Sequence, residues 1–396
     1  MTRAVPKTWG FFAGGLATVL ISMSFPLDGT RSTAASEIGE FVGTSGGGSA
    51  SSGARLFAAN LFVEIIASQV LEKDGDAVSV GVIDVGGVPF GSVRQRGAAE
   101  PALTIDTPFR MASVSKTVTA TVVLGLVDDG LLSLDDRPVA ALLDRRGVSC
   151  EIDGLSDVRV RDLLAHTSGF DARREWFFDE VVDDTEELLG RFCSKGLRTS
   201  PGASYRYSNF NYLLLGWLIE DVTGTTYAVA VDSLLLEPND LDSFVFHTTS
   251  SRRPNEPSYQ VDPGSNYMEL LGAAGAWSAS AVDLARFAGI LATSGAGDGP
   301  LSSRMWATMR SPTRSSSGGS AWGYGLGVRL FSGGSWGHTG SIESIKALMI
   351  GLPDGGSVAV LIDGDRPERT DDLIEIVAEA WWMTHHVGFV IAIPPT

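Results

Sequence analysis

The sequence predicts an α+β fold in which one antiparallel β-sheet is built from both chain ends, is flanked by helices, and carries an inserted, mostly helical lobe. Short apolar runs bounded by Gly, Pro and Asp turns, which are typical of strands, occur near both ends of the chain. Helical periodicity dominates the middle. The strands of the two ends are therefore expected to pair in one sheet, with an active site between the sheet and the helical lobe.

The elements follow in chain order. A helix is expected over 55–73, where apolar residues recur at helical spacing, and a hairpin turning at Gly86 and Gly87 follows it. A closing helix is expected to begin at Thr370 or Asp371 and to run through Trp382. The expected strands are 78–84, 325–331, 344–352 and 356–363. The expected helices of the middle are 116–129, 160–165, 184–193, 211–222 and 280–293.

These patterns divide the chain into four parts. Residues 1–35 are expected to be an export signal or anchor, and residues 36–54 a linker rich in Gly and Ser. Residues 55–110 and 270–396 are expected to form the α/β sheet lobe, and residues 111–269 the mostly helical lobe.

The first segment predicts export. Arg3 and Lys7 precede a mainly apolar stretch over 9–23, which is too short to be a comfortable membrane span. Two candidate cleavage points, after Ser24 and near Ala35, stay open, and so does an uncleaved anchor. An extracytoplasmic protein, secreted or held in the cell envelope, is expected, and it would contact a membrane only through this segment.

Composition and charge limit the partners. The chain has 396 residues, of which 44% are hydrophobic, so it can form a large core. Its 30 basic and 47 acidic residues give a net charge of −17, which repels nucleic acid and anionic membranes. The expected partner is a small-molecule or peptide substrate, and the oligomeric state stays open.

Cysteine and histidine usage predicts neither a metal nor a cofactor. The only two cysteines, Cys150 and Cys193, could form one disulfide in an exported chain, and two buried free thiols are an equally good interpretation. The five histidines show no metal-binding spacing.

The strongest chemical signal is Ser113 followed three residues later by Lys116. Residues i and i+3 share one face of a helix, so the lysine amine can reach the serine hydroxyl if a helix begins here. The sequence after Lys116 is apolar nearly all round and predicts a buried helix, in which a lone lysine needs a reason. Alone, the pair could also be a helix cap beside a solvated charge.

Two further segments add chemistry. Tyr207 and Asn209 belong to a Tyr-Ser-Asn run in a loop just before an expected helix. His338-Thr339-Gly340 lies in strand-rich sequence. Each has a structural interpretation when taken singly: a packed aromatic, a helix cap, a satisfied polar residue and a bulge glycine.

Together and in this order, the three segments resemble the signature motifs of the penicillin-recognising serine hydrolases, which include class C β-lactamases, D-alanyl-D-alanine carboxypeptidases, D-aminopeptidases and related esterases. The resemblance runs from about residue 78 to residue 363 and includes lesser segments such as Leu-Ala-His-Thr-Ser-Gly, in which His166 is expected to be a helix-terminus residue. It implies a β-lactamase/transpeptidase-like fold. The variant with Tyr-Ser-Asn and His-Thr-Gly is most similar to the carboxypeptidase and esterase branches.

The resemblance also implies roles. Ser113 would attack a carbonyl, Lys116 would accept its proton, and Tyr207 would protonate the leaving group. The oxyanion would be held by the backbone N–H groups of Ser113 and Ser341. The implied substrate-binding residues are Asn209, His338, Thr339, Gly340 and Ser341.

One departure from the family pattern bears on the substrate. Relatives usually have a glycine a few residues after the third motif, where this chain has Glu343. If Glu343 points inward, it would repel a substrate carboxylate and favour neutral esters or amides; the alternative is a solvated side chain.

Three functions are weighed. The first is an exported serine hydrolase that forms an acyl-enzyme on Ser113 and cleaves amide, peptide or ester bonds. The second is a non-catalytic penicillin- or peptide-binding sensor that retains the pocket. The third is a Ser-His-Asp hydrolase built on Ser45 or Ser168 with His338, but the Gly-x-Ser-x-Gly run at Ser45 lacks the strand and helix that this motif requires.

Overall fold

A computed structural model describes residues 52–72, 76–96, 102–171, 185–249, 256–257, 259, 266–313 and 323–391. The expected export segment and almost all of the expected linker lie outside the described residues. The division into lobes at the expected boundaries stays a prediction. Among the helices of the described residues, none is both long enough and apolar enough to span a lipid bilayer.

The main sheet joins the two ends of the chain, as the sequence predicts. Within the described residues it has seven antiparallel strands in the order β2-β1-β10-β9-β8-β7-β6. The pairing of β1 with β10 places Ala77 opposite Asp363 and Ile83 opposite Ser357. The strands are β1 (Ala77–Ile83), β2 (Pro89–Gln95), β6 (Gly323–Tyr324), β7 (Arg329–Leu330), β8 (Trp336–Ile342), β9 (Ile345–Gly351) and β10 (Ser357–Asp363).

The single strand expected over 325–331 is wrong. Within that range only the two residues of β7 are a strand; its partner β6, also of two residues, precedes the range, and a turn connects the two. The turn exists because Gly327, at φ +85°, contacts α3 (Ser115–Asp128): its carbonyl accepts a 2.9 Å hydrogen bond from the Thr117 hydroxyl, and a Cβ there would lie 2.2 Å from Ala120 Cβ. A second, three-stranded sheet, which the sequence did not predict, has the order β3 (Phe109–Arg110), β5 (Trp277–Ala279), β4 (Val245–Phe246).

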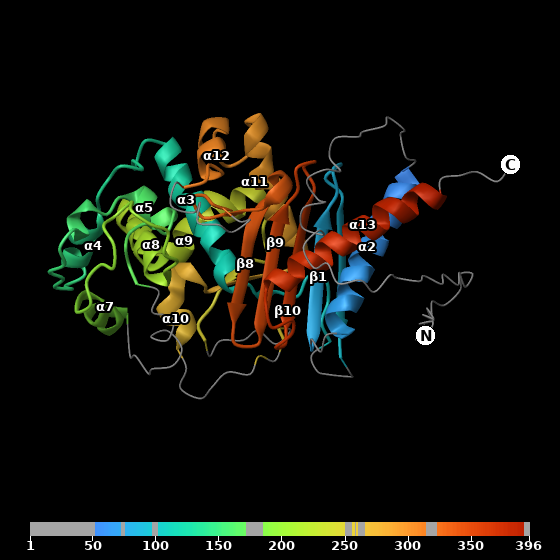
Figure 1. Ribbon diagram of the computed structural model, residues 1–396, viewed down its shortest axis with the longest axis horizontal. Helices are drawn as coiled ribbons and strands as arrows, with labels where there is room; N and C mark the ends of the chain where they lie inside the picture. Colours follow the sequence, from blue (N-terminus) through green and yellow to red (C-terminus); the bar gives the residue numbers. More distant parts are fainter. Residues whose placement is uncertain are drawn as a thin grey trace, which may run out of the picture.

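Two terminal helices cover one face of the main sheet. They are α2 (Ser52–Glu72), which begins three residues before its expected start, and α13 (Asp371–Ile391). Figure 1 shows α13 passing in front of β10 and β1, with α2 beside it to the right of β1. Their contact with the sheet is apolar; it includes Phe62, Ile66, Val70, Leu373 and Val377 from the helices and Val78, Val80, Leu348, Val360 and Ile362 from the strands. We call this set the back layer.

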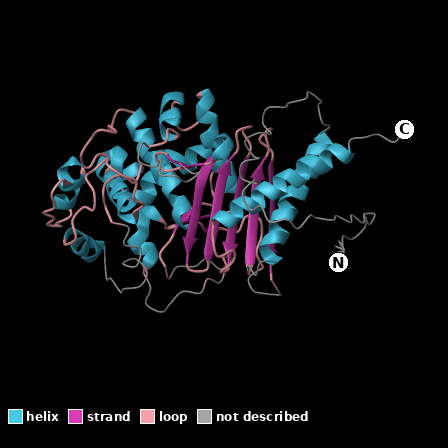
Figure 2. Cartoon of the chain, viewed as in Figure 1, coloured by secondary structure: helices cyan, strands magenta, loops and turns pink. Residues whose placement is uncertain are grey.

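The opposite face of the sheet packs on α11 (Ala281–Thr293) and on the helical lobe. Gly81 is required there because a Cβ would lie 2.1 Å from the Ala281 carbonyl oxygen. The lobe lies to one side of the sheet, as the separate groups of helices and strands in Figure 2 make plain. Its helices are α3, α4 (Val139–Arg145), α5 (Val160–Leu164), α7 (Thr185–Cys193), α8 (Asn209–Thr223), α9 (Tyr227–Val231) and α10 (Tyr267–Leu271).

The remaining helical segments are short. They are α12 (Ser303–Met309), a π-helical turn at Asp232–Leu236, and the 3-10 turns η2 (Ala112–Val114), Leu155–Asp157, Glu237–Asn239, η6 (Gly272–Ala274), Ser294–Ala296 and Ser332–Gly334.

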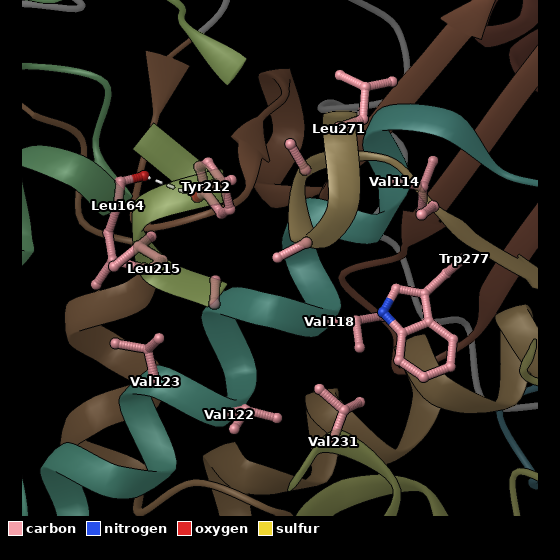
Figure 3. Packing of buried hydrophobic residues seen from close by; sticks show 14 of the residues in the cluster. Val114, Val118, Val122, Val123, Leu164, Tyr212, Leu215, Val231, Leu271 and Trp277 are labelled. Carbon is pink, nitrogen blue, oxygen red and sulfur yellow. Dashed lines mark hydrogen bonds between the residues drawn. The ribbon is translucent and has the colours of Figure 1, made fainter. Parts of the chain in front are cut away.

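The core of the lobe is organised around α3, which is buried nearly all round, as its sequence predicts. Val118, Val122 and Val123 pack among side chains from α5, α8, α9 and β5, including Leu164, Leu215, Val231 and Trp277 (Figure 3). Cys150 and Cys193 form a disulfide that ties the loop after α4 to the end of α7, which decides between the two interpretations left open by the sequence. A helix that is held on all sides is a rigid support for side chains at its start.

Candidate active site

Ser113 lies in the short turn η2, between β3 and the start of α3. The residue before it, Ala112, has φ +47°, which is uncommon for a residue with a side chain and costs conformational energy. The turn is crossed at close range by β8: a Cβ on Gly340 would lie 2.4 Å from the Met111 carbonyl oxygen and 3.1 Å from the Ser113 nitrogen. Only glycine therefore allows β8 to run directly beside the serine.

Lys116 projects from the first turn of α3 and is completely buried. Its Nζ lies 3.0 Å from Ser113 Oγ, and it donates hydrogen bonds to Asn209 Oδ1 at 2.9 Å and to the carbonyl oxygen of Ala274 at 2.7 Å. Burial lowers the pKa of the lysine well below its ordinary value, because the charged form loses its hydration. The amine therefore sits beside the serine with its protonated form disfavoured.

Tyr207 and Asn209 come from the loop that enters α8. Ser208 has extended backbone angles and precedes the first helical residue, Asn209, so the helix start fixes the amide that contacts Lys116. Tyr207 is half-buried, and its ring centroid lies 5.0 Å from Lys116 Nζ. The structure thus brings Ser113, Lys116, Tyr207 and Asn209 together from two segments of the chain.

The third predicted segment lies on β8. β7 pairs with β8 only at Trp336 and Gly337, so among the described strands no partner covers the rest of this edge of β8, which runs past η2. Thr339 is buried and Ser341, which directly follows Gly340, is half-buried. Gly340 is the residue of β8 that lies directly beside Ser113, and a role for the N–H of the following Ser341 stays a prediction.

His338 does not point a free nitrogen at the serine. Its Nδ1 lies 2.6 Å from the carbonyl oxygen of Thr339 and so carries the proton, and its Nε2 lies 3.1 Å from the hydroxyl of Tyr324, which then donates. Burial, followed by the charges of Arg329 and Lys116, lowers the pKa of His338 well below its usual value. The imidazole is accordingly neutral, with both nitrogens engaged.

Sequence reasoning missed several polar groups of this region. The carbonyl of Ala274 in η6, which accepts from Lys116, has no signal in the sequence. Tyr212 and Tyr324 are fully buried phenols whose pKa values burial raises well above the usual one. His166, expected only at a helix terminus, does follow α5, but its ring also lies 4.2 Å from that of Tyr207.

Glu343 occupies the turn between β8 and β9, at φ +45°. Its side chain is exposed, and its backbone carbonyl accepts a 3.0 Å hydrogen bond from Lys346 Nζ. Its carboxylate lies near the Tyr267 hydroxyl: burial first, and then Glu343, raises the pKa of this tyrosine to about 12, and Arg110 donates to the same hydroxyl at 2.6 Å. Glu343 thus adds negative charge at the end of the strand that borders the serine.

A metal centre has no support in the described parts of the chain, where no three His, Cys, Asp or Glu side chains are grouped closely enough to hold an ion. The chemistry available at this site is that of a hydroxyl, a buried amine, phenols and backbone N–H groups.

Comparison with known proteins shows the family of the chain. The profile of the Beta-lactamase family matches residues 13–379. Esterase EstB of Burkholderia gladioli is 32% identical over 174 residues, which is 40% of this chain and 43% of the esterase, so the chain spans less than half of that relative. Penicillin-binding protein 4 of Amycolatopsis lactamdurans is 29% identical over 66% of this chain and 73% of its own length.

Solved structures give the same result. A D-stereospecific amidohydrolase from Streptomyces sp. superposes with a TM-score of 0.66 at 26% identity, covering 80% of this chain and 97% of the other. An octameric penicillin-binding protein homologue from Pyrococcus abyssi has a TM-score of 0.68 at 23% identity, covering 81% and 76% of the two chains, and supports the fold alone. These matches confirm the predicted α+β fold, and the esterase and the amidohydrolase are hydrolases by name. The chain belongs to the Beta-lactamase family.

Proposed function

We propose that this protein is a serine hydrolase that forms an acyl-enzyme on Ser113 and cleaves amide, peptide or ester bonds. The observation that carries the proposal is the buried Lys116 amine at 3.0 Å from the Ser113 hydroxyl. A serine hydroxyl is a weak nucleophile until an adjacent base accepts its proton. Lys116 can be that base because burial disfavours its protonated form.

The hydrogen-bond arrangement around Lys116 suits this role. A neutral amine has two N–H donors and one lone pair. The carbonyl oxygen of Ala274 and Oδ1 of Asn209 accept the two N–H groups, at 2.7 and 2.9 Å. The lone pair is then left for the hydroxyl of Ser113, which donates its proton as its oxygen attacks.

The proposed reaction has two halves. Ser113 Oγ bonds to the substrate carbonyl carbon, Lys116 takes the hydroxyl proton, and the backbone N–H groups of Ser113 and Ser341 hold the oxyanion. The bond to the leaving group then breaks, and Tyr207 gives that group a proton, which the Lys116 ammonium replaces. Water attacks the acyl-enzyme in the second half, with the proton transfers reversed, and releases the acid product and the free serine.

The charges of the site favour substrates without a carboxylate next to the scissile bond. His338 is neutral and engaged at both nitrogens, and the pKa of Lys116 is lowered. Arg110 donates to Tyr267 and to the carbonyl of Thr249, and Glu343 adds negative charge near by. Neutral esters and amides therefore fit better than acidic peptides, which agrees with the names of the esterase and amidohydrolase relatives.

Covalent labelling tests the proposal directly. A fluorophosphonate probe should add its mass to the wild-type protein at Ser113 and should not label Ser113→Ala, whereas Ser45→Ala, the matched serine control, should label normally. Labelling of Ser113→Ala would show another nucleophile. Lys116→Ala should lose labelling; retention of activity there would support a histidine-based hydrolase.

Turnover separates the enzyme from a sensor that only binds. Short-chain p-nitrophenyl esters, D-amino-acid amides, D-Ala-D-Ala peptides and nitrocefin should be compared under one set of conditions. We expect turnover of the neutral esters or amides and weak turnover of the D-Ala-D-Ala peptides. Covalent labelling without turnover of any substrate would support the penicillin- or peptide-binding sensor.

Export is part of the same proposal and rests on the first 35 residues of the sequence. Expression of the full chain should place activity outside the cytoplasm, with mass spectrometry of the N-terminus distinguishing a cleaved signal from an anchor. Activity confined to the cytoplasm would contradict it.

A further inference from the structure

His166 is a buried polar residue that the proposed reaction does not use. It directly follows the C-cap of α5, has φ +57° and is completely inaccessible to solvent. A left-handed backbone in a residue with a side chain costs energy and indicates that the surroundings require it. The hydrogen bonds made by the backbone and by the ring of His166 show what this conformation provides.

The backbone around His166 carries the loop that contains Tyr207. The carbonyl oxygen of His166 accepts from the N–H of Arg206 at 2.7 Å, and that of Thr167 accepts from Gly202 at 2.8 Å. Gly169 continues this pairing, because its carbonyl oxygen accepts from Arg198 at 2.8 Å. The loop before α8 is therefore held against the segment 166–169 by backbone hydrogen bonds.

The imidazole fixes the last turn of that loop. Nδ1 accepts a hydrogen bond from the backbone N–H of Ser208 at 3.2 Å, which requires that it carries no proton. Asn211 Nδ2, at 2.8 Å, then donates to the same nitrogen. The hydroxyl of Ser168 donates to Asn211 Oδ1 at 2.6 Å and so sets the direction of that amide. The proton of His166 is accordingly on Nε2.

The other side of the ring faces the phenols. The ring centroid lies 4.2 Å from that of Tyr207 with the planes tilted by 34°, and 5.0 Å from that of Tyr324. Among the described residues, buried Nε2 has no hydrogen-bond partner. The ring is therefore held through Nδ1 and through its contacts with the phenols.

We propose that His166 is a positioning residue: its Nδ1 holds the Ser208 backbone and its ring supports Tyr207 from behind, so that the phenol stays packed against Lys116 and keeps water from the amine. The Tyr207 ring contacts both groups: its centroid lies 5.0 Å from Lys116 Nζ and 4.2 Å from the centroid of the His166 ring. The inference rests on the proposed function and concerns how the amine of Lys116 stays shielded from water.

The charged and titratable groups around His166 are consistent with a neutral ring. Burial lowers its pKa well below the usual value, and electrostatic interaction with Lys116, His338 and Arg329 lowers it further, while the hydrogen bond from Ser208 acts in the opposite direction. The titratable and charged groups around His166 are Lys116, Tyr205, Tyr207, Tyr212, Tyr324, His338 and Arg329. Because His166 stays neutral, a change in the pH profile of a His166 variant reports on Lys116.

Two substitutions separate the hydrogen bond from the ring. His166→Phe keeps an aromatic ring and removes the Nδ1 acceptor, leaving the buried Ser208 N–H unpaired. His166→Asn places Oδ1 where Nδ1 was, and asparagine tolerates the left-handed backbone. Leu163→Ala is the stability control. Leu163 is fully buried in α5, and its apolar side chain has no part in the hydrogen bonds that hold the Tyr207 loop.

The pH dependence of kcat is the deciding readout, with active sites counted by the fluorophosphonate probe. We expect His166→Phe to lose on the order of 10²-fold in kcat. Its acid limb should move to higher pH by about one unit, because water that reaches Lys116 raises the amine pKa. His166→Asn should recover at least about tenfold of the loss. Leu163→Ala should lower the melting temperature and leave the limb in place.

Each other outcome overturns the inference. If His166→Phe keeps the wild-type pH limb and kcat per labelled site, or if its change matches that of Leu163→Ala, the histidine is only structural. If His166→Asn is as impaired as His166→Phe, the Nδ1 hydrogen bond does not position the loop. Failure of the wild-type protein to label or turn over would instead overturn the proposed function, so the two failures are distinguishable.

Discussion

The two faces of the main sheet differ in what they bury. The back layer, between the sheet and helices α2 and α13, consists of apolar side chains such as Ile66, Val360 and Val377. The other side of the molecule, where β8 meets η2 and the helical lobe, buries Lys116, His166 and His338 completely. Buried polar groups cost stability unless they are fully paired. The difference teaches that this chain accepts that cost beside Ser113, and stabilises the same sheet by apolar packing on its other face.

The largest expected effect comes from removing the amine. Lys116→Met keeps a long, flexible side chain of similar volume in an apolar environment but cannot accept a proton. We expect kcat/KM to fall on the order of 10³-fold, as for loss of a general base, while the circular dichroism spectrum is retained. A variant that keeps more than about a tenth of the activity would show that Lys116 is not the base.

A second comparison uses two glycines of the same sheet. Gly340→Ala places a Cβ 2.4 Å from the Met111 carbonyl oxygen and must push β8 away from η2. The only close contact of Gly91→Ala in β2 is with the side chain of Val282, at 2.7 Å, and the next atoms lie at 3.5 Å or more. We expect Gly340→Ala to lose on the order of 10²-fold in kcat per labelled site and Gly91→Ala to lose stability alone. Equal kcat values in the two variants would contradict the placement of the oxyanion site between β8 and η2.

The back layer should affect stability and not chemistry. Ile66 is completely buried in this layer, so Ile66→Ala should cost about 2–4 kcal/mol in the free energy of unfolding through lost burial and a residual cavity. Urea denaturation measures the loss, and steady-state kinetics should show an unchanged kcat and pH profile. A shifted pH limb in Ile66→Ala would mean that the two faces are coupled.

The smallest expected effect concerns a carboxyl at the end of β10. Burial, with help from Asp76, raises the pKa of Asp363 to about 6. The folded state therefore holds this proton more tightly than the unfolded state, and the stability that it contributes at low pH is lost as the pH rises through about 6. Relative to wild type, Asp363→Asn should gain on the order of 2 kcal/mol between pH 4 and pH 8. A constant difference across that range would contradict the raised pKa.

The sequence predicted what depends on periodicity and on residue type. Helix α3, the pairing of strands from both chain ends, and the segments that carry Ser113, Lys116, Tyr207 and His338 all leave clear patterns. Two-residue strands such as β6 leave none, because alternation needs several residues. The acceptor on Ala274 is a backbone carbonyl, which every residue has.

The role of His166 was also beyond the sequence. A histidine after a helix has an ordinary interpretation as a helix-terminus residue, and only coordinates show that its ring lies against Tyr207 and that its Nδ1 meets the N–H of Ser208. Long-range contacts of this kind join segments about 40 residues apart, and no local pattern records them. The Tyr324 hydroxyl that donates to His338 comes from 14 residues away along the chain and likewise leaves no local pattern.

The pH dependence of the acylation rate tests the central claim most directly. In stopped-flow experiments with an activated neutral ester, wild-type acylation should fall as the pH is lowered through one ionisation whose pKa lies well below the usual lysine value, because protonation of Lys116 removes the base. The same ionisation should be absent from the residual rate of Lys116→Met. An unchanged limb in Lys116→Met, or a wild-type limb at the ordinary pKa of lysine, would contradict a buried neutral amine that serves Ser113.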